Sequence, residues 1–215
     1  MEPRSLNYRP DIDGLRAVAV LSVVFFHFNR NWLPGGFIGV DIFFVISGYL
    51  ITGIVAKQVD SGSFSFADFY LRRVRRILPA AFIVTIVTVA LGSVLMLPED
   101  AVLLAKSGFA SSLSAANIYF WAFLDTGYFA ASSDLQPLLH MWSLGVEEQF
   151  YLVWPALLYL SYRYGGQHLQ LVIAAIIAVV SFWIAEHYLG KDQKFAYYML
   201  PARAGELLIG AMLSM

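Results

Sequence analysis

The chain has 215 residues, of which 59 % are hydrophobic and 13 % are charged. A soluble domain is closer to about half apolar and about a quarter charged, so the composition excludes an ordinary soluble protein and indicates an integral membrane protein. The formal net charge of −1 excludes a strongly basic surface, and nucleic acid is therefore not an expected partner. Because the chain has no cysteine, disulfides, thiolate metal sites and a cysteine nucleophile are also excluded.

The first predicted element is an uncleaved membrane helix at residues 14–29. Arg4 and Arg9 precede this apolar stretch, as basic residues precede the apolar core of a signal peptide. However, Arg16 and His27 interrupt it, and no small-residue cleavage site follows. These features favour a retained span over a cleaved leader.

Further spans follow from the need for about 20 mostly apolar residues per crossing. Helices are predicted at residues 37–56, 77–97, 139–162 and 169–188, and a sixth runs from about residue 199 to residue 215. The predicted fold class is therefore all-α, a polytopic transmembrane helix bundle. Since the sixth helix ends within an apolar stretch, we expect the chain to be a fragment of a longer domain.

The segment 101–124 is long enough to cross the membrane, but its composition is unusual for a span. It contains Lys106 and several polar or small residues, so we expect an interfacial or re-entrant segment. If it did cross, every later helix would have the opposite orientation.

The orientation is predicted from basic residues in short loops, which favour the cytoplasmic side. The segment between the second and third predicted spans carries Lys57, Arg72, Arg73, Arg75 and Arg76. We therefore expect this segment and the N-terminus in the cytoplasm, and residues 29–36 outside.

Arg16 and His27 share one face of the first predicted helix, about three turns and about 16 Å apart. In the expected orientation, Arg16 lies near the cytoplasmic end and His27 near the outer end. The structural alternative is a snorkelling arginine and a hydrogen-bonded core histidine. Ionisable residues within spans are rare and usually functional, and two on one face favour a functional site.

A second polar stripe follows one face of the helix predicted at residues 139–162. Its members are His140, Ser143, Glu147 and Tyr151. A carboxylate such as Glu147 or its neighbour Glu148 is costly within a span unless a cation or a proton accompanies it. A glutamate paired with histidine is suited to general acid–base catalysis. The alternative places both acids among the lipid headgroups.

The arginine segment has two alternative functions. Arg73 and Arg76, or Arg72 and Arg75, share a helix face, and paired guanidinium groups suit phosphate. The structural alternative is an anchor that only fixes orientation.

Two shorter motifs have simpler interpretations. Ser47 and Gly48 are small residues that favour close helix approach, and close approach of a ligand is the alternative. Arg203 and Glu206 can pair along one helix, which lowers the cost of both charges in a membrane. The sequence has no glycine-rich phosphate loop, zinc motif or nucleophile elbow, and we predict no metal site.

These motifs occur in a defined order along the chain. They are Tyr8-Arg-Pro-Asp-Ile-Asp-Gly-Leu-Arg16, the spacing of Arg16 and His27, Phe43-Phe44-x-x-Ser47-Gly48, the Arg-x-x-Arg segment, His140-x-Trp142-Ser143-Leu-x-Val-Glu147-Glu-Gln-Phe-Tyr151 and residues 201–206. Together they resemble the acyltransferase 3 family, especially the bacterial surface-polysaccharide O-acetyltransferases. The resemblance covers essentially the whole chain, so residues 1–215 are expected to be the N-terminal portion of such a membrane domain.

The resemblance implies an enzyme of the bacterial inner (plasma) membrane that transfers acetyl groups. The donor would be cytoplasmic acetyl-CoA, a co-substrate rather than a tightly bound cofactor. The acceptor would be a hydroxyl of an extracytoplasmic glycan or lipid-linked sugar. The expected partners are therefore the lipid bilayer, acyl-CoA and a glycan.

The resemblance also implies roles for individual residues. His27 would act as general base or carry the acyl group transiently, and Glu147 would orient it from the outer half of the membrane. The donor-binding residues would be Arg16, Arg72, Arg73, Arg75 and Arg76. The supporting residues would be Ser47, Ser143, His140, Tyr151, Arg203 and Glu206.

Two other functional classes remain open at this point. The buried charges could line the path of a transporter or flippase for a lipid-linked sugar. Alternatively, the chain could be a non-catalytic partner in a membrane assembly.

Overall fold

The computed structural model describes residues 9–124 and 136–215, and the regular elements in these ranges are all helical. Arg4 and Tyr8 lie outside the described residues. The elements are α1 (Pro10–Phe28), the short 3₁₀ helix η1 (Gly36–Ile38), α2 (Gly39–Asp60), α3 (Phe66–Leu95), α4 (Pro98–Ser112), α5 (Ala116–Phe123), α6 (Met141–Leu189), α7 (Gln193–Tyr198) and α8 (Leu200–Leu213). Three helical stretches are long and apolar enough to cross a membrane: Gly36–Asp60, Phe66–Leu95 and Met141–Leu189. The predicted all-α fold class is confirmed.

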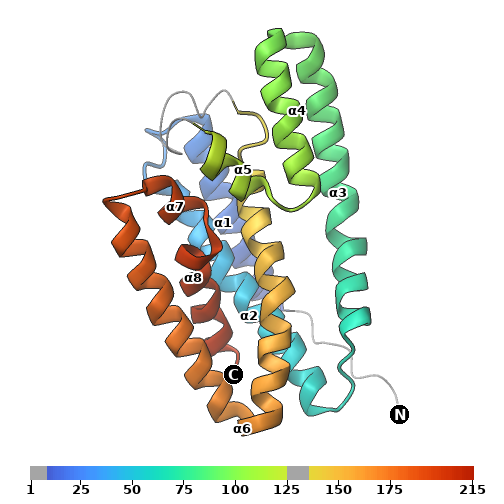
Figure 1. The fold of residues 1–215 in the computed structure, drawn as a ribbon, viewed down its shortest axis with the longest axis vertical. Helices are drawn as coiled ribbons and strands as arrows, with labels where there is room; N and C mark the ends of the chain where they lie inside the picture. Colours follow the sequence, from blue (N-terminus) through green and yellow to red (C-terminus); the bar gives the residue numbers. More distant parts are fainter. Residues whose placement is uncertain (1–8, 125–135) are drawn as a thin grey trace.

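The spans predicted at residues 139–162 and 169–188 form the two arms of one element, the 49-residue α6. Gly166 separates the arms, with a φ of +62° and a ψ of −159°. Only glycine adopts this region readily, because it has no Cβ. The chain reverses direction there, so that the first arm descends and the second rises in Figure 1.

Helix α3 begins at Phe66, well before the predicted start at residue 77. The Ser65 hydroxyl caps the helix by accepting a hydrogen bond from the backbone N–H of Asp68 at 3.3 Å. Arginine is a good helix former, so the basic segment continues the helix instead of forming a loop. The four arginines therefore have fixed helical faces.

The segment 101–124 does not form a spanning helix. Helix α4 returns only part of the way along α3, and α5 stays in the same half of the bundle (Figure 1). Between them the chain turns at Ser114, whose φ is +54°. The buried Asn117 amide donates to the Gln149 side chain at 3.3 Å and to the Tyr198 carbonyl at 3.2 Å, and Gln149 donates to the Ser114 carbonyl at 3.1 Å. These bonds supply the protein partners that irregular backbone needs at membrane depth.

The two ends of the bundle carry different chemistry. Helix α1 rises toward His27, α2 descends, and α3 rises again from the basic segment at residues 72–76 (Figure 1). We call the end near residues 72–76 the arginine end and the end near His27 the histidine end. Helices α5 and α7 lie at the histidine end (Figure 1).

Glycines bring α2 into backbone contact with its neighbours. A Cβ placed on Gly48 would lie 1.8 Å from the Leu207 carbonyl oxygen of α8, and one on Gly210 would lie 1.8 Å from the Val45 carbonyl oxygen. On the α1 side, a Cβ on Gly39 would lie 2.2 Å from the Ala19 oxygen. Close helix approach at Gly48 is therefore confirmed, as is typical of small residues in membrane helices.

Replacement of Gly48 by alanine is expected to destabilise the fold by at least about 2 kcal/mol, since the new methyl group would have to separate two backbones. Thermal unfolding of the detergent-solubilised protein measures this loss. Gly53→Ala in the same helix is the matched control, because the atom nearest to its Cβ position is 3.9 Å away. Equal unfolding temperatures for the two variants would contradict the close packing of α2 on α8.

Candidate active site

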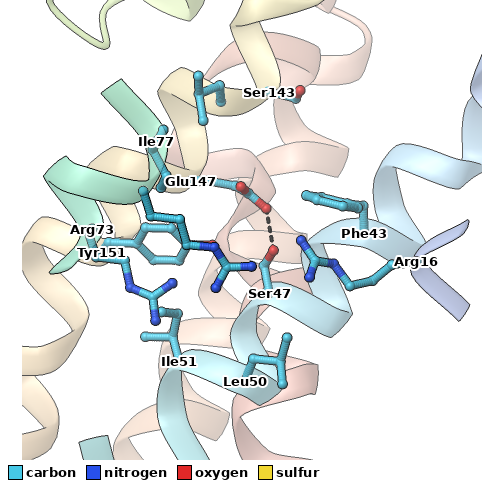
Figure 2. Close-up of a pocket in the computed structure, with 12 residues that line it drawn as sticks. Arg16, Phe43, Ser47, Leu50, Ile51, Arg73, Ile77, Ser143, Glu147 and Tyr151 are labelled. Carbon is cyan, nitrogen blue, oxygen red and sulfur yellow. Dashed lines mark hydrogen bonds between the residues drawn. The ribbon is translucent and has the colours of Figure 1, made fainter. Parts of the chain in front are cut away.

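Polar side chains from four helices line one cavity of about 230 Å³ (Figure 2). The polar and charged lining consists of Arg16 from α1, Ser47 from α2, Arg73 and Arg76 from α3, and Ser143, Glu147 and Tyr151 from α6. The remaining lining consists of Phe43, Leu50, Ile51, Ile77 and Leu144. The fold thus brings together residues from four of the motifs that the sequence indicated.

Glu147 is the carboxylate in the lining of this cavity, and 6 % of its surface is exposed. It accepts a hydrogen bond from the Ser47 hydroxyl, and the phenol of Tyr151 faces the same two side chains. Figure 2 shows Arg16 pointing from α1 toward Ser47 and Glu147, where its charge interacts with the carboxylate. The cost of a buried carboxylate is therefore offset by a donor and a nearby cation.

The arginine segment divides into two pairs. Arg73 and Arg76 line the cavity, and the guanidinium of Arg73 lies over the rings of Phe69 and Tyr151 at 5.6 and 5.8 Å. Arg72 and Arg75 do not line the cavity, and Arg72 instead donates to the Gln58 side chain at 3.5 Å. Helical spacing allowed either pair to share a site, and the packing of α3 selects Arg73 and Arg76.

His27 does not line this cavity. It lies near the end of α1, at the histidine end of the bundle. Its Nδ1 is 2.8 Å from the Val23 carbonyl oxygen, which can only accept, so Nδ1 carries the proton. The ring also meets Phe26 edge-on at 5.5 Å. In the neutral imidazole this arrangement leaves the basic lone pair on Nε2.

His27 and Glu147 do not occupy the same level. His27 lies within electrostatic range of His140, which directly precedes α6. Glu147 is about two turns further along α6, or about 10 Å deeper. Within the described residues its hydrogen-bonding partner is Ser47, so the structure gives Glu147 a different neighbour from the one expected.

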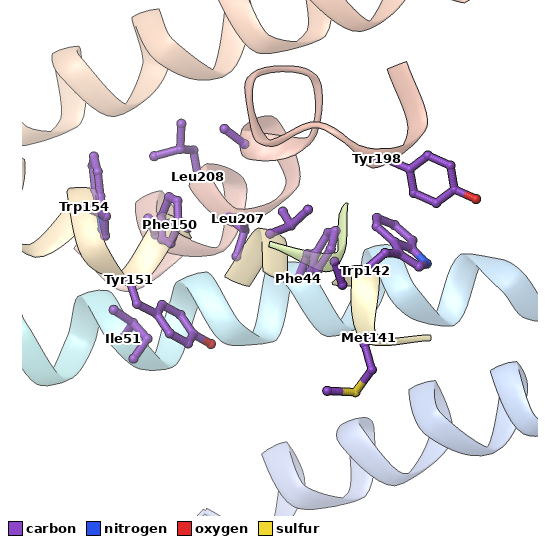
Figure 3. Packing of buried hydrophobic residues seen from close by; sticks show 14 of the residues in the cluster. Phe44, Ile51, Met141, Trp142, Phe150, Tyr151, Trp154, Tyr198, Leu207 and Leu208 are labelled. Atoms are coloured by element: carbon purple, nitrogen blue, oxygen red, sulfur yellow. The ribbon is translucent and has the colours of Figure 1, made fainter. Parts of the chain in front are cut away.

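Arg203 sits in a compact charged cluster between α2 and α8. It pairs with Glu206 at 3.1 Å, as the helical spacing predicts, and also with Asp41. Its guanidinium lies 5.6 Å from the ring of Phe44 and 5.9 Å from that of Trp142. Figure 3 shows these two rings side by side in the buried core.

Asp41 is a site residue that the sequence interpretation did not single out, and Phe43 was named in the Phe43-Phe44-x-x-Ser47-Gly48 motif without a role of its own. Asp41 is an acid within the predicted second span, the kind of residue that marks a site in other spans. Phe43 contacts the guanidinium of Arg16, 5.5 Å from the ring centre. Its place in that motif, one helical turn before Ser47, is the sequence signal that pointed to it.

Ser143 has a local structural contact as well as its place in the cavity. Its hydroxyl donates to the His140 carbonyl at 3.1 Å, at the first turn of α6. This bond connects the start of α6 near His27 with the cavity wall.

Comparison with known proteins identifies the family. A profile of the acyltransferase domain matches residues 9–215. The chain belongs to the acyltransferase 3 family. The family assignment and the long apolar helices together make it a multi-pass membrane protein.

Members of the acyltransferase 3 family among curated proteins are clearly similar to this chain. The peptidoglycan O-acetyltransferase OatA of Listeria monocytogenes is 40 % identical over 214 residues, 98 % of this chain and 34 % of the relative. The Bacillus subtilis protein named "Putative peptidoglycan O-acetyltransferase YrhL" is 38 % identical over 218 residues, 97 % of this chain and 33 % of the relative. The chain thus spans about a third of the length of these relatives. No solved structure matches it.

Proposed function

We propose that this chain forms the acetyl-donor part of a membrane O-acetyltransferase. The enzyme moves an acetyl group from cytoplasmic acetyl-CoA to a hydroxyl of a cell-wall glycan outside the plasma membrane. The observation that carries the proposal is the cavity in which Arg16, Arg73 and Arg76 face a buried Glu147. The name of the listerial relative supports peptidoglycan as the acceptor.

The charge of the cavity fits an anionic donor. Three guanidinium groups and one carboxylate leave an excess of positive charge in a site of low dielectric constant. Guanidinium groups bind phosphate oxygens through paired hydrogen bonds, and acetyl-CoA carries several phosphates. Basic residues at the arginine end also favour a cytoplasmic location for that end and for the N-terminus.

His27 is proposed to act at the histidine end, where the acceptor arrives. Its Nε2 takes the proton of the sugar hydroxyl while the hydroxyl oxygen attacks the thioester carbonyl. The new ester bond forms as the carbon–sulfur bond breaks, and the CoA thiolate then takes up a proton. The pantetheine arm of CoA is long and flexible, so phosphates near Arg73 are compatible with a thioester about three helical turns away.

The test uses sealed vesicles that contain the full chain, with radiolabelled acetyl-CoA on the side of the arginine end. The expected result is an alkali-labile acetyl ester on glycan supplied on the opposite side. A transporter would move a lipid-linked sugar without consuming acetyl-CoA, and an assembly partner would do neither. Either of those results would overturn the proposal.

Glu147→Gln is expected to lower kcat by about 100-fold without raising KM for acetyl-CoA. The substitution removes a negative charge beside the arginines, so phosphate binding is not weakened. Steady-state kinetics in vesicles separate the two parameters. Glu99→Gln at the exposed start of α4 is the control. A raised KM with an unchanged kcat would show that Glu147 serves only to hold Arg16.

A further inference from the structure

A second cavity of about 380 Å³ opens between the second arm of α6, α7 and the start of α8. Its lining includes Phe182, Glu186, Gln193, Tyr197 and Arg203. Because α7 lies at the histidine end, this cavity faces the opposite end of the bundle from residues 72–76 (Figure 1). It is separate from the arginine-lined cavity, with which it shares no residue.

The polar groups of this second cavity have unused hydrogen-bonding capacity. In the part of the chain that the structure describes, the side chains of Glu186 and Gln193 make no hydrogen bond or ion pair with protein. The Nε of Arg203 is buried there without an acceptor, although its other nitrogens bind Asp41 and Glu206. The exposed carboxylate of Glu186 and the exposed amide of Gln193 thus offer acceptor and donor positions at one space, while the largely buried Arg203 guanidinium adds positive charge behind the wall.

Aromatic side chains complete the cavity wall. The ring of Phe182 packs on one side against Gly205, where a Cβ would come within 2.6 Å of it, and its other side is exposed. The ring of Tyr197 forms another part of the wall and lies 4.8 Å from the ring of Trp142. Aromatic surfaces beside hydrogen-bonding groups suit a hydroxyl-rich pyranose ring, whose C–H face packs on the aromatic wall while its hydroxyl groups bind the polar side chains.

We propose that this cavity is an acceptor subsite that binds one ring of an N-acetylhexosamine glycan. The cavity takes the sugar ring against its aromatic wall, and Glu186 and Gln193 bind its hydroxyl and acetamido groups. The choice of glycan rests on the proposed function, in which the acceptor approaches from the histidine end.

The subsite is connected to the proposed catalytic histidine by a short series of contacts. Tyr197 touches Trp142, Trp142 belongs to the first turn of α6, and His140 precedes that turn beside His27. A glycan is longer than one ring, so a ring held in the cavity positions the next ring along the aromatic wall toward His27. The subsite thereby selects polymeric acceptors over single sugars.

The experiment measures direct binding of a β-1,4-linked N-acetylglucosamine tetramer to the full chain in detergent by titration calorimetry. Glu186→Gln and Gln193→Ala are each expected to weaken binding about tenfold, the loss of one hydrogen bond to a polar or charged group. Glu99→Gln on α4 is the matched control and is expected to bind like the unmodified chain. Acetyl-CoA binding is expected to be the same in all four proteins.

The outcomes separate this inference from the proposed function. Equal tetramer affinity in the unmodified chain, Glu186→Gln and Gln193→Ala would overturn the subsite, even if acetyl transfer proceeds. Absence of tetramer binding to the unmodified chain would also overturn it. Tetramer binding that the two variants weaken would support the subsite, even if the chain neither binds nor uses acetyl-CoA.

Discussion

Replacement of His27 by alanine is expected to reduce acetyl transfer to the glycan by at least about 10³-fold, within the range that a general base contributes. The Val23 carbonyl holds the Nδ1 proton, so Nε2 is the atom that accepts a proton from the sugar. The substitution removes that atom from a helix end without adding a charge. Transfer of labelled acetyl groups in vesicles measures the loss.

The controls for His27→Ala separate catalysis from folding. Loss of a polar group from a span favours membrane insertion, so the amount of inserted protein is expected to be unchanged or higher. His168→Ala replaces an exposed histidine near the turn of α6 and is expected to retain full activity. Normal transfer by His27→Ala would remove this residue from the mechanism.

Lysine replacement of Arg73 and Arg76 together is expected to raise KM for acetyl-CoA by about 10- to 100-fold. Lysine keeps the positive charge but loses the planar fork that binds two phosphate oxygens at once. Both arginines line the cavity, and Arg73 is also held against Phe69 and Tyr151. Steady-state kinetics with acetyl-CoA as the varied substrate provide the measurement.

The matched control exchanges the other pair, Arg72 and Arg75, for lysine. These side chains do not line the cavity, so KM is expected to stay within about twofold of the unmodified value. All the replacements preserve the basic charge, and the orientation in the membrane is expected to be the same in both double variants. An equal rise in KM for both pairs would contradict a specific role of Arg73 and Arg76. It would show that any arginine of this basic segment contributes equally to acetyl-CoA binding.

The sequence predicted the spans at residues 37–56, 77–97, 139–162 and 169–188 well, because they correspond to helical stretches long and apolar enough to cross a membrane. The spans predicted at residues 14–29 and 199–215 correspond to helices α1 and α8, which are not among those stretches. The sequence misplaced the start of α3, since hydropathy marks where a helix enters lipid and not where it begins at Ser65. It placed the two arms of α6 as two spans, which agrees with the reversal of the chain at Gly166. The difference at α3 arises because the helix end and the membrane boundary do not coincide.

The sequence identified most residues of the candidate site, but it did not predict how they are arranged in space. Periodicity placed Glu147 on the same helix face as His140, but it does not fix the depth of α6 relative to α1. That depth depends on where α6 starts, which the packing of α5 through Asn117 and Gln149 helps to set. Such long-range polar contacts leave no periodic signal, so the pairing of Glu147 with Ser47 was not expected.

The reversal of α6 at Gly166 has a consequence for how the chain enters the bilayer. The two arms are joined at a single residue of positive φ, in a turn that carries the polar residues Arg163, Gln167 and His168. The short turn makes the arms one helical hairpin, so we expect them to enter the bilayer as a pair. A residue with a Cβ at position 166 would strain that turn, so its expected effect is a smaller amount of inserted protein.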